Sequence, residues 1–244
     1  MKKNHIKKTI LFIMLFFYSF SEGQTLLHYW NFNSNASVSA ITTPSQTSIV
    51  GASLSATISG ISAIDFNGGT GQNFSVLNLN ARNSDASGTH LRFNDPIGSS
   101  LVFALPTTGY ENAIMKFSTR RSGSGAGTQV WSYSTDGTNY TFFTNVTPNN
   151  GDPGLATLDF SSISAADNNP NFKLKVEFIQ GTGGTVGNNR FDNFTAEGTL
   201  LSSSDTIAPT VTFLPLNLAT NIASTTYPTI SFNESVRLLN NDAI

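Results

Sequence analysis

Few residues in this sequence of 244 residues could perform catalysis. Cysteine is absent, so a thiol nucleophile is excluded. His28 and His90 have no neighbouring serine and aspartate in the arrangement of a catalytic triad, and no two histidines have the spacing of metal ligands. The sequence therefore predicts no catalytic residues.

Carboxylates are the remaining groups with catalytic potential, because glycosidases hold two of them close together. Between residues 24 and 198 the glutamates are Glu111, Glu177 and Glu197, and they are isolated from one another in the sequence. Carboxylates from separate strands can still meet in a folded sheet. A glycosidase therefore stays open as an alternative to a non-enzymatic protein.

The clearest local motif is the stretch WSYSTDGTNYTFF at residues 131–143. Its Asp-Gly pair predicts a tight hairpin turn, because glycine accepts positive φ and aspartate caps neighbouring amides. Two interpretations of its aromatic residues are open: they pack into a core, or Trp131, Tyr133 and Tyr140 form an exposed platform for the C–H faces of a sugar. Trp131 and Tyr133 share one strand face, so only some of the three can point outward.

A second stretch of interest, RFDNFTAEG, occupies residues 190–198. As a strand, its period-two alternation places Asp192 on the same face as Phe194 and Ala196. A carboxylate that is left unpaired among core residues costs several kcal/mol, so Asp192 needs a partner.

These residues belong to a chain that is rich in β-strand signals. Apolar or alternating runs recur between Gly, Asn, Asp and Ser, and no stretch has a sustained 3.6-residue apolar period. About ten short strands predict an all-β fold, a two-sheet antiparallel β-sandwich that is jelly-roll-like and spans residues 24–198. The candidate strands are residues 25–32, 53–60, 62–66, 89–93, 100–105, 112–121, 129–134, 139–146, 156–163, 172–180 and 190–198.

In such a sandwich we expect the partner of Asp192 near one rim. Jelly-roll binding modules often hold a structural Ca²⁺ there, and Ca²⁺ takes six to eight oxygen ligands. Asp192 and Asp65, with Asn33 or Asn31 from the first strand, would supply part of such a set. The alternative partners are Arg190, Arg92 and exposed backbone amides.

Residues 1–23 have the features of a secretory signal peptide. An N-terminal region with four lysines precedes an apolar run at residues 9–20. Ser21 and Gly23 are small residues at positions −3 and −1 of a possible cleavage site before Gln24. The apolar run is too short to span a bilayer comfortably, which takes roughly 20 residues, and an N-terminal membrane anchor is the alternative. We therefore expect a secreted or cell-surface protein.

Charge narrows the range of partners. The formal charge of the whole chain is −2; without residues 1–23, 9 of the 13 basic and 14 of the 15 acidic residues remain, a balance of −5. Nucleic acid is not an expected partner, because phosphate binding needs a positive surface and the sequence has no basic cluster. No later apolar run is long enough to span a membrane, so no membrane insertion is expected after signal removal.

Residues 199–206 have the composition of a linker, and residues 207–244 begin a second β unit. Its two or three strands cannot bury a core, so we expect the first part of a truncated domain from a longer protein. The segment resembles the opening of bacterial Ig-like domains of the SbsA type. The resemblance implies an incomplete Ig-like β-sandwich. It rests on Pro209, Pro215, Thr220, Asn221 and the stretch ISFNESV at residues 230–236.

The first domain opens with LLHYWNFN and ends with NNRFDNFTAEG. In these stretches it resembles the N-terminal jelly-roll-like, carbohydrate-binding-like modules of secreted Bacteroidetes surface proteins. The resemblance implies a non-catalytic module that recognises a polysaccharide or another cell-surface glycan. Two alternatives are a structural or adhesin unit with no small ligand, and an accessory domain of a larger secreted hydrolase or nuclease.

Overall fold

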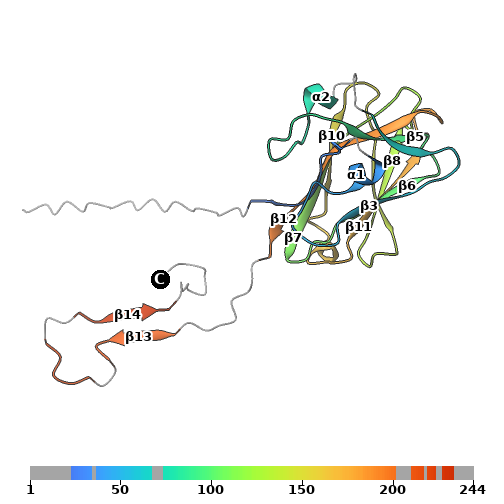
Figure 1. Cartoon of the computed structure of the whole chain (residues 1–244). Coiled ribbons are helices and arrows are strands. Elements are labelled where there is room, and N and C mark those ends of the chain that lie inside the picture. The colour runs from blue at the N-terminus through green and yellow to red at the C-terminus, as the bar shows by residue number, and fades with distance from the viewer. Residues whose placement is uncertain are drawn as a thin grey trace, which may run out of the picture. The chain divides into compact units, whose positions relative to one another are not determined.

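The structure, a computed structural model, describes residues 23–34, 37–67, 74–201, 210–216, 219–223 and 227–233. The chain divides into two compact units, residues 1–201 and 202–244, which we describe one at a time (Figure 1). The predicted signal peptide lies outside the described residues except for Gly23, and so does most of the predicted linker.

The first unit consists mainly of short strands, because its alternating apolar and polar residues suit a sheet with one buried face. Its described strands are β1 (Thr25–Trp30), β2 (Gln46–Thr47), β3 (Ser53–Thr57), β4 (Ala63–Asn67), β5 (His90–Asn94), β6 (Ser100–Ala104), β7 (Tyr110–Arg121), β8 (Thr128–Ser134), β9 (Thr141–Val146), β10 (Gly154–Asp159), β11 (Lys173–Ile179) and β12 (Asn188–Leu200). The described helical segments are α1 (Val38–Thr42), α2 (Phe74–Leu77) and the 3₁₀ turn η1 (Ser164–Ala166).

These strands form two sheets that face each other across a core. Sheet A has the order β10-β7-β12-β1-β2, and β12 also pairs with β5, which pairs with β4. Sheet B has the order β3-β6-β11-β8-β9. The first strand of the unit pairs antiparallel with the last, and the chain passes repeatedly between the sheets, as in a jelly roll. The predicted two-sheet antiparallel β-sandwich is confirmed.

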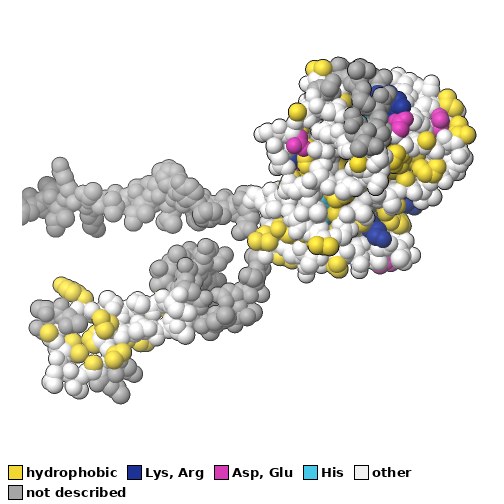
Figure 2. All heavy atoms as spheres, in the orientation of Figure 1, with side chains coloured by type: hydrophobic (Ala, Val, Ile, Leu, Met, Phe, Trp, Pro, Cys, Tyr) yellow, Lys and Arg dark blue, Asp and Glu magenta, His cyan; other side chains and the backbone are white. Residues whose placement is uncertain are grey.

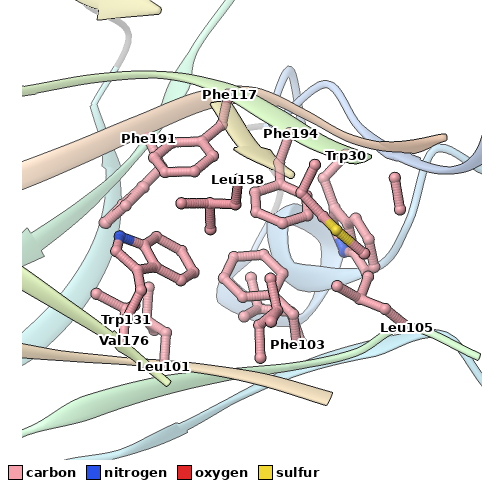
Figure 3. Packing of buried hydrophobic residues seen from close by; sticks show 14 of the residues in the cluster. Trp30, Leu101, Phe103, Leu105, Phe117, Trp131, Leu158, Val176, Phe191 and Phe194 are labelled. Atoms are coloured by element: carbon pink, nitrogen blue, oxygen red, sulfur yellow. The ribbon is translucent and has the colours of Figure 1, made fainter. Parts of the chain in front are cut away.

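Aromatic side chains from both sheets fill the space between them (Figure 3). Phe194 of sheet A stacks on Phe103 of sheet B with 4.2 Å between the ring centroids, and Trp131 of sheet B lies 4.9 Å from Phe117 of sheet A. All four side chains are fully buried. Burial of a large apolar side chain stabilises a fold by about 1.5–3 kcal/mol, so this cluster helps a chain without cysteine to hold its sheets together.

A β-bulge at Asn193 reverses the face that alternation predicts for Asp192. Between the paired positions on either side of the bulge, β12 advances three residues where β7 advances two. Asn193 is the extra residue, with a positive φ of 47°. The prediction that Asp192 shares a face with Phe194 and Ala196 is therefore wrong: those two side chains lie in the core, whereas Asp192 points to the outer face of sheet A.

Replacement of Asn193 by alanine should destabilise the first unit by about 2–4 kcal/mol. The buried side chain accepts a hydrogen bond from the Tyr29 hydroxyl (2.8 Å) and donates to Asn78 Oδ1 (3.1 Å) and the Leu79 carbonyl (3.0 Å). Urea denaturation of Asn193→Ala and Asn193→Gly separates the two contributions. Glycine loses the same bonds but adopts positive φ freely, so its cost should be about 1 kcal/mol smaller. Parental stability in both variants would contradict this role.

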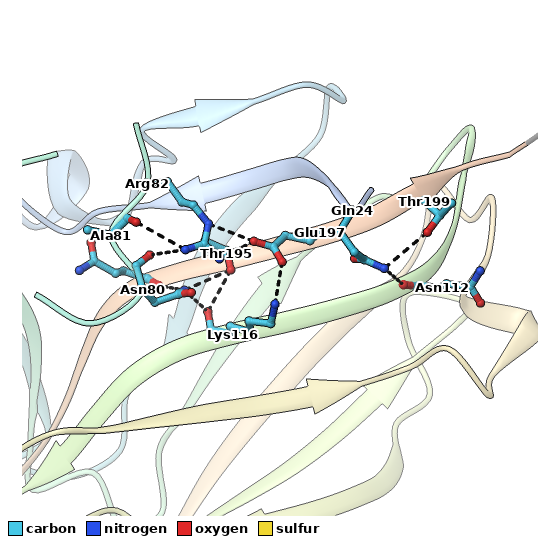
Figure 4. A network of polar contacts seen from close by, with 10 residues as sticks. Gln24, Asn80, Ala81, Arg82, Asn112, Lys116, Thr195, Glu197 and Thr199 are labelled. Carbon is cyan, nitrogen blue, oxygen red and sulfur yellow. Dashed lines mark hydrogen bonds and ion pairs between the residues drawn. The ribbon is translucent and has the colours of Figure 1, made fainter. Parts of the chain in front are cut away.

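The segment that follows α2 lies over part of the outer face of sheet A (Figure 4). Arg82 donates to Oε1 of Glu197 through Nε (3.0 Å) and Nη2 (2.5 Å), and Nζ of Lys116 lies 3.0 Å from Oε2 of Glu197. The side-chain amide of Asn80 donates to the carbonyls of Lys116 and Asn193. These contacts attach the segment to β7 and β12, so this end of the outer face is covered by the chain itself.

The second unit contains the described strands β13 (Val211–Leu214) and β14 (Thr229–Phe232), which pair antiparallel. Most of their side chains are exposed, and Figure 2 shows hydrophobic side chains scattered over this hairpin. Its membership of an Ig-like domain stays a prediction. In the described part of the chain, no helix has both the length and the apolar character that a membrane span requires.

Candidate functional site

A row of three arginine side chains crosses the outer face of sheet A. Arg190 of β12 pairs directly with Arg92 of β5 on one side and with Arg120 of β7 on the other. Asp65 of β4 pairs with Arg92 and extends the row. Directly opposed residues on neighbouring strands point to the same face with Cβ atoms roughly 5 Å apart. Four strands thus bring four ionisable side chains together.

A second set of polar side chains lies next to this row on the same face. Asp192 pairs with Ser118 of β7, and His90 of β5 comes one position beyond the last described pair of β12 with β5, Phe191 with Leu91. The three polar residues are buried, and the ring of Phe74 in α2 stacks on His90 with 4.7 Å between the centroids. We call the following six residues the sheet-A polar cluster: His90, Arg92, Ser118, Arg120, Arg190 and Asp192.

Several polar atoms of this cluster have no hydrogen-bond partner among the described residues. Both ring nitrogens of His90 and the hydroxyl of Ser118 are buried without a partner. Arg190 donates one described hydrogen bond, from Nε to Asn188 Oδ1 at 2.8 Å. Asp192 accepts one, from the backbone amide of the next residue, and none of the described ion pairs includes it. A buried unsatisfied polar group costs about 1–3 kcal/mol of folding stability. The cluster therefore destabilises the fold unless a ligand binds there.

The three arginines differ in how their charges are balanced. Arg92 forms a two-bond ion pair with Asp65, from Nε to Oδ1 at 2.7 Å and from Nη2 to Oδ2 at 2.5 Å. Arg120 donates to two backbone carbonyls, and the charge of Asp152 also acts on it. Arg190 lies between them and makes no ion pair with a described residue.

Burial and neighbouring charges shift the pKa values in the cluster. Burial, together with the charges of Arg120 and Arg92, lowers the pKa of Arg190 to about 10. Burial is also the largest cause that lowers the pKa of His90 to about 3, followed by the charges of the arginines. Burial raises the pKa of Asp192 well above its ordinary value. At pH 7, His90 is therefore neutral whereas Arg190 is charged.

The structure divides the aromatic residues of the 131–143 hairpin. Trp131 is fully buried between the sheets, so the prediction that it binds a ligand is wrong: its strand position points the indole into the core. Tyr133, on the same face, packs edge-on against Phe143. Tyr140 is half-buried with Nζ of Lys175 4.9 Å from its ring centre, and its role in binding stays a prediction.

The predicted calcium ligands lie on separate strands and make other contacts. The carboxylate of Asp65 is bound by Arg92 and by Asn94 (3.1 Å), and Asn33 donates to a backbone carbonyl. Strand β5 separates β4 from β12, which puts Asp65 and Asp192 roughly 10 Å apart. In the part of the chain that the structure describes, no three His, Asp or Glu side chains gather as a metal site. The structure does not bring the three ligands together, and calcium stays a prediction.

Two of the glutamates weighed as a glycosidase pair lie on opposite sides of the sandwich. Glu177 is on the outer face of sheet B, where Nζ of Lys175 lies 3.1 Å from its carboxylate. Glu197 is on the outer face of sheet A, bound by Arg82 and Lys116. Packed sheets alone are about 10 Å apart, so Glu177 and Glu197 cannot act on one glycosidic bond.

Sequence reasoning missed the polar cluster as a group. The sequence suggested Arg92 and Arg190 only as possible partners of Asp192. It did not indicate Ser118 or Arg120 as functional residues. The available signal was that each arginine occupies a polar position in an alternating strand. That signal indicates an outward face but does not say which strands are neighbours.

A scan against models of protein families finds no match, and neither does a search of curated proteins. Among solved structures, the chain is similar to the K1 cleaved adhesin domain of Lys-gingipain from Porphyromonas gingivalis, with 8% identity, 70% of this chain and 97% of that chain covered, and a TM-score of 0.44. It is also similar to the xylan-binding module CBM15, with 16% identity, 51% and 90% covered, and a TM-score of 0.35.

A third similar structure is the xylan-binding domain from CBM 22, with 13% identity, 62% of this chain and 88% of that chain covered, and a TM-score of 0.36. The CBM22-1 and GH10 modules of Clostridium thermocellum xylanase 10B match over 50% of this chain but only 24% of their own chain. Because these TM-scores are below 0.5, the likenesses carry no argument about a ligand.

Proposed function

We propose that this chain is an exported, non-catalytic recognition module that binds a glycan on the outer face of sheet A. The observation that supports the proposal is the sheet-A polar cluster, in which polar side chains from three strands converge and buried groups have no described partner. Sugar hydroxyl groups both donate and accept hydrogen bonds, so they suit a mixture of guanidinium, imidazole, hydroxyl and carboxyl groups. The signal-like composition of residues 1–23 supports export.

The cluster is also rigid, which favours binding. Its residues lie on β5, β7 and β12, and each of these strands is paired on both sides with described neighbours. Strand pairing fixes the backbone, and burial restricts the side-chain rotamers before a ligand arrives. Preorganised polar groups lose little conformational entropy on binding, so more of the interaction energy appears as affinity.

A glycan array probed with the chain from Gln24 onward tests this proposal. We expect at least one class of glycan to bind, and Arg92→Gln to weaken that binding at least tenfold. The Arg92 side chain is 24% exposed, so the variant removes a charged donor at the accessible end of the cluster. Tyr140→Ala, on the hairpin of sheet B, is the control and should bind like the parent.

Two outcomes would contradict the proposal. No binding to any glycan, neutral or acidic, would favour the alternative of a structural adhesin unit with no small ligand. Loss of binding in Tyr140→Ala with unchanged binding in Arg92→Gln would place the site on the hairpin instead. A role as an accessory domain of a larger secreted hydrolase or nuclease is compatible with the same glycan site.

A further inference from the structure

We propose that the glycan bound by the sheet-A polar cluster is acidic, and that Arg190 binds the carboxylate of one of its uronic acid units. This inference rests on the proposed function, because it names the class of glycan for that same site. Arg190 is 8% exposed and has an arginine directly opposite it on each neighbouring strand. A buried charge without a counter-ion costs several kcal/mol, and opposed like charges add to that cost.

The carboxylates near Arg190 have other positions or partners. Asp65 is held by both hydrogen bonds of its ion pair with Arg92. Asp152 acts on the arginine on the other side of the row. Asp192 lies in the next row, and its one described hydrogen bond comes from a backbone amide. Among the described residues, Arg190 therefore forms no ion pair, and the one carboxylate whose charge acts on it, that of Asp65, is already bound by Arg92.

A second observation indicates a ligand at the same place. His90 is fully buried, and among the described residues neither of its ring nitrogens has a hydrogen-bond partner. His90 lies two residues before Arg92 in β5, on the same face, so the imidazole lies close to the row. The hydroxyl of Ser118 is also buried and has no partner in the part of the chain that the structure describes. These unpartnered polar atoms lie beside the guanidinium group to which we assign the carboxylate.

The geometry of the row favours a planar carboxylate. The hydrogen bond from Nε of Arg190 to Asn188 orients the guanidinium group, and no described residue accepts a hydrogen bond from its two Nη groups. A guanidinium group donates two parallel hydrogen bonds to a carboxylate in its own plane. The ion pair between Arg92 and Asp65, one strand away, shows that this arrangement fits on the same face.

The test compares a soluble oligogalacturonide with its methyl ester, because the two share a backbone and differ in charge. Isothermal titration with the chain from Gln24 onward should give a dissociation constant at least tenfold lower for the free acid. Arg190→Gln should abolish this preference. Lys175→Gln is the matched control, because it removes one positive charge from the outer face of sheet B and should leave the preference unchanged.

Thermal denaturation supplies a second measurement. Because Arg190 has no described counter-ion, Arg190→Gln should melt at the parental temperature or above it, and the free acid should raise the melting temperature of the parent alone. A clear drop in the melting temperature of Arg190→Gln without ligand would assign the residue a structural role and overturn the inference.

The remaining outcomes separate this inference from the proposed function. Equal binding of the acid and the ester would overturn the acidic specificity and leave glycan recognition standing. Binding of dextran sulfate or single-stranded DNA as tight as that of the acid would indicate a general polyanion site and overturn the carboxylate assignment. If neither form binds and no other glycan does, the proposed function itself fails.

Discussion

Replacement of Trp131 by alanine should destabilise the sandwich by about 3–5 kcal/mol, the range for truncating a buried tryptophan. Its indole is fully buried and contacts Phe117, Phe191 and Phe194 across the two sheets (Figure 3). For a unit of this size the loss corresponds to a fall in melting temperature of roughly 10 °C. Thermal and urea denaturation would measure it.

The control for this prediction comes from the same hairpin. Phe142 is 60% exposed, so Phe142→Ala should change the unfolding free energy by no more than about 1 kcal/mol. If Trp131→Ala instead kept the parental stability and lost glycan binding, the indole would be a binding platform after all. The comparison therefore distinguishes the core position from the exposed position that the motif also allowed.

Two buried groups of the sheet-A polar cluster should give the fold opposite and offsetting pH dependences. Burial, followed by the charges of Arg190, Arg92 and Arg120, lowers the pKa of His90 from 6.5 to about 3, with Asp65 acting in the opposite direction. As the pH falls, His90 is therefore protonated near pH 6.5 in the unfolded chain but stays neutral in the folded chain. Stability due to neutral His90 is present above pH 6.5 and is lost as the pH falls towards 3.

Asp192 has the reverse sign. Burial raises its pKa well above 3.8, so the folded chain keeps a proton that the unfolded chain has released. Its contribution to stability is present below about pH 4 and is lost as the pH rises through the raised pKa. Above about pH 4 the two effects oppose each other until the pH passes the raised pKa of Asp192, so the parent should show a weaker pH dependence there than either single variant.

Single variants should reveal each titration. In Asp192→Asn, the unfolding free energy should fall by about 1.4 kcal/mol per pH unit from pH 6.5 to 4, roughly 3 kcal/mol in all, because the titration of His90 is no longer offset. In His90→Gln, stability should instead rise as the pH falls through the raised pKa of Asp192 towards about pH 4. Urea denaturation at several pH values gives both slopes. A flat profile for Asp192→Asn would mean that His90 accepts a proton in the folded state.

Local alternation predicted much of this sandwich correctly. Ala113, Met115 and Phe117 occupy alternate positions in a predicted strand, and all three lie in the core of β7. The same reasoning placed Trp131 and Tyr133 on one face, where the structure also has them. Alternation works here because successive side chains of a strand point to opposite faces, whatever the strand pairs with.

The same rule did not predict the face of Asp192, because one inserted residue changes every later position by one face. The signal for the bulge is Asn193, whose side chain is bonded to the Tyr29 hydroxyl and to the segment after α2. Asparagine tolerates positive φ better than most residues, but that tolerance alone does not locate a bulge. The position of the bulge at Asn193 is determined by its contacts with distant segments of the chain.

By itself, the sequence determined the all-β class, the approximate strands and the low net charge, since each depends on composition or on neighbours a few residues apart. The tertiary structure alone decided that Arg92, Arg120 and Arg190, which are far apart in the sequence, lie side by side. Their adjacency comes from the pairing of β12 with both β5 and β7. The hydrogen-bond register between distant strands is set by the packing of the whole core, so a chain with no basic cluster in its sequence acquires a row of arginines when it folds.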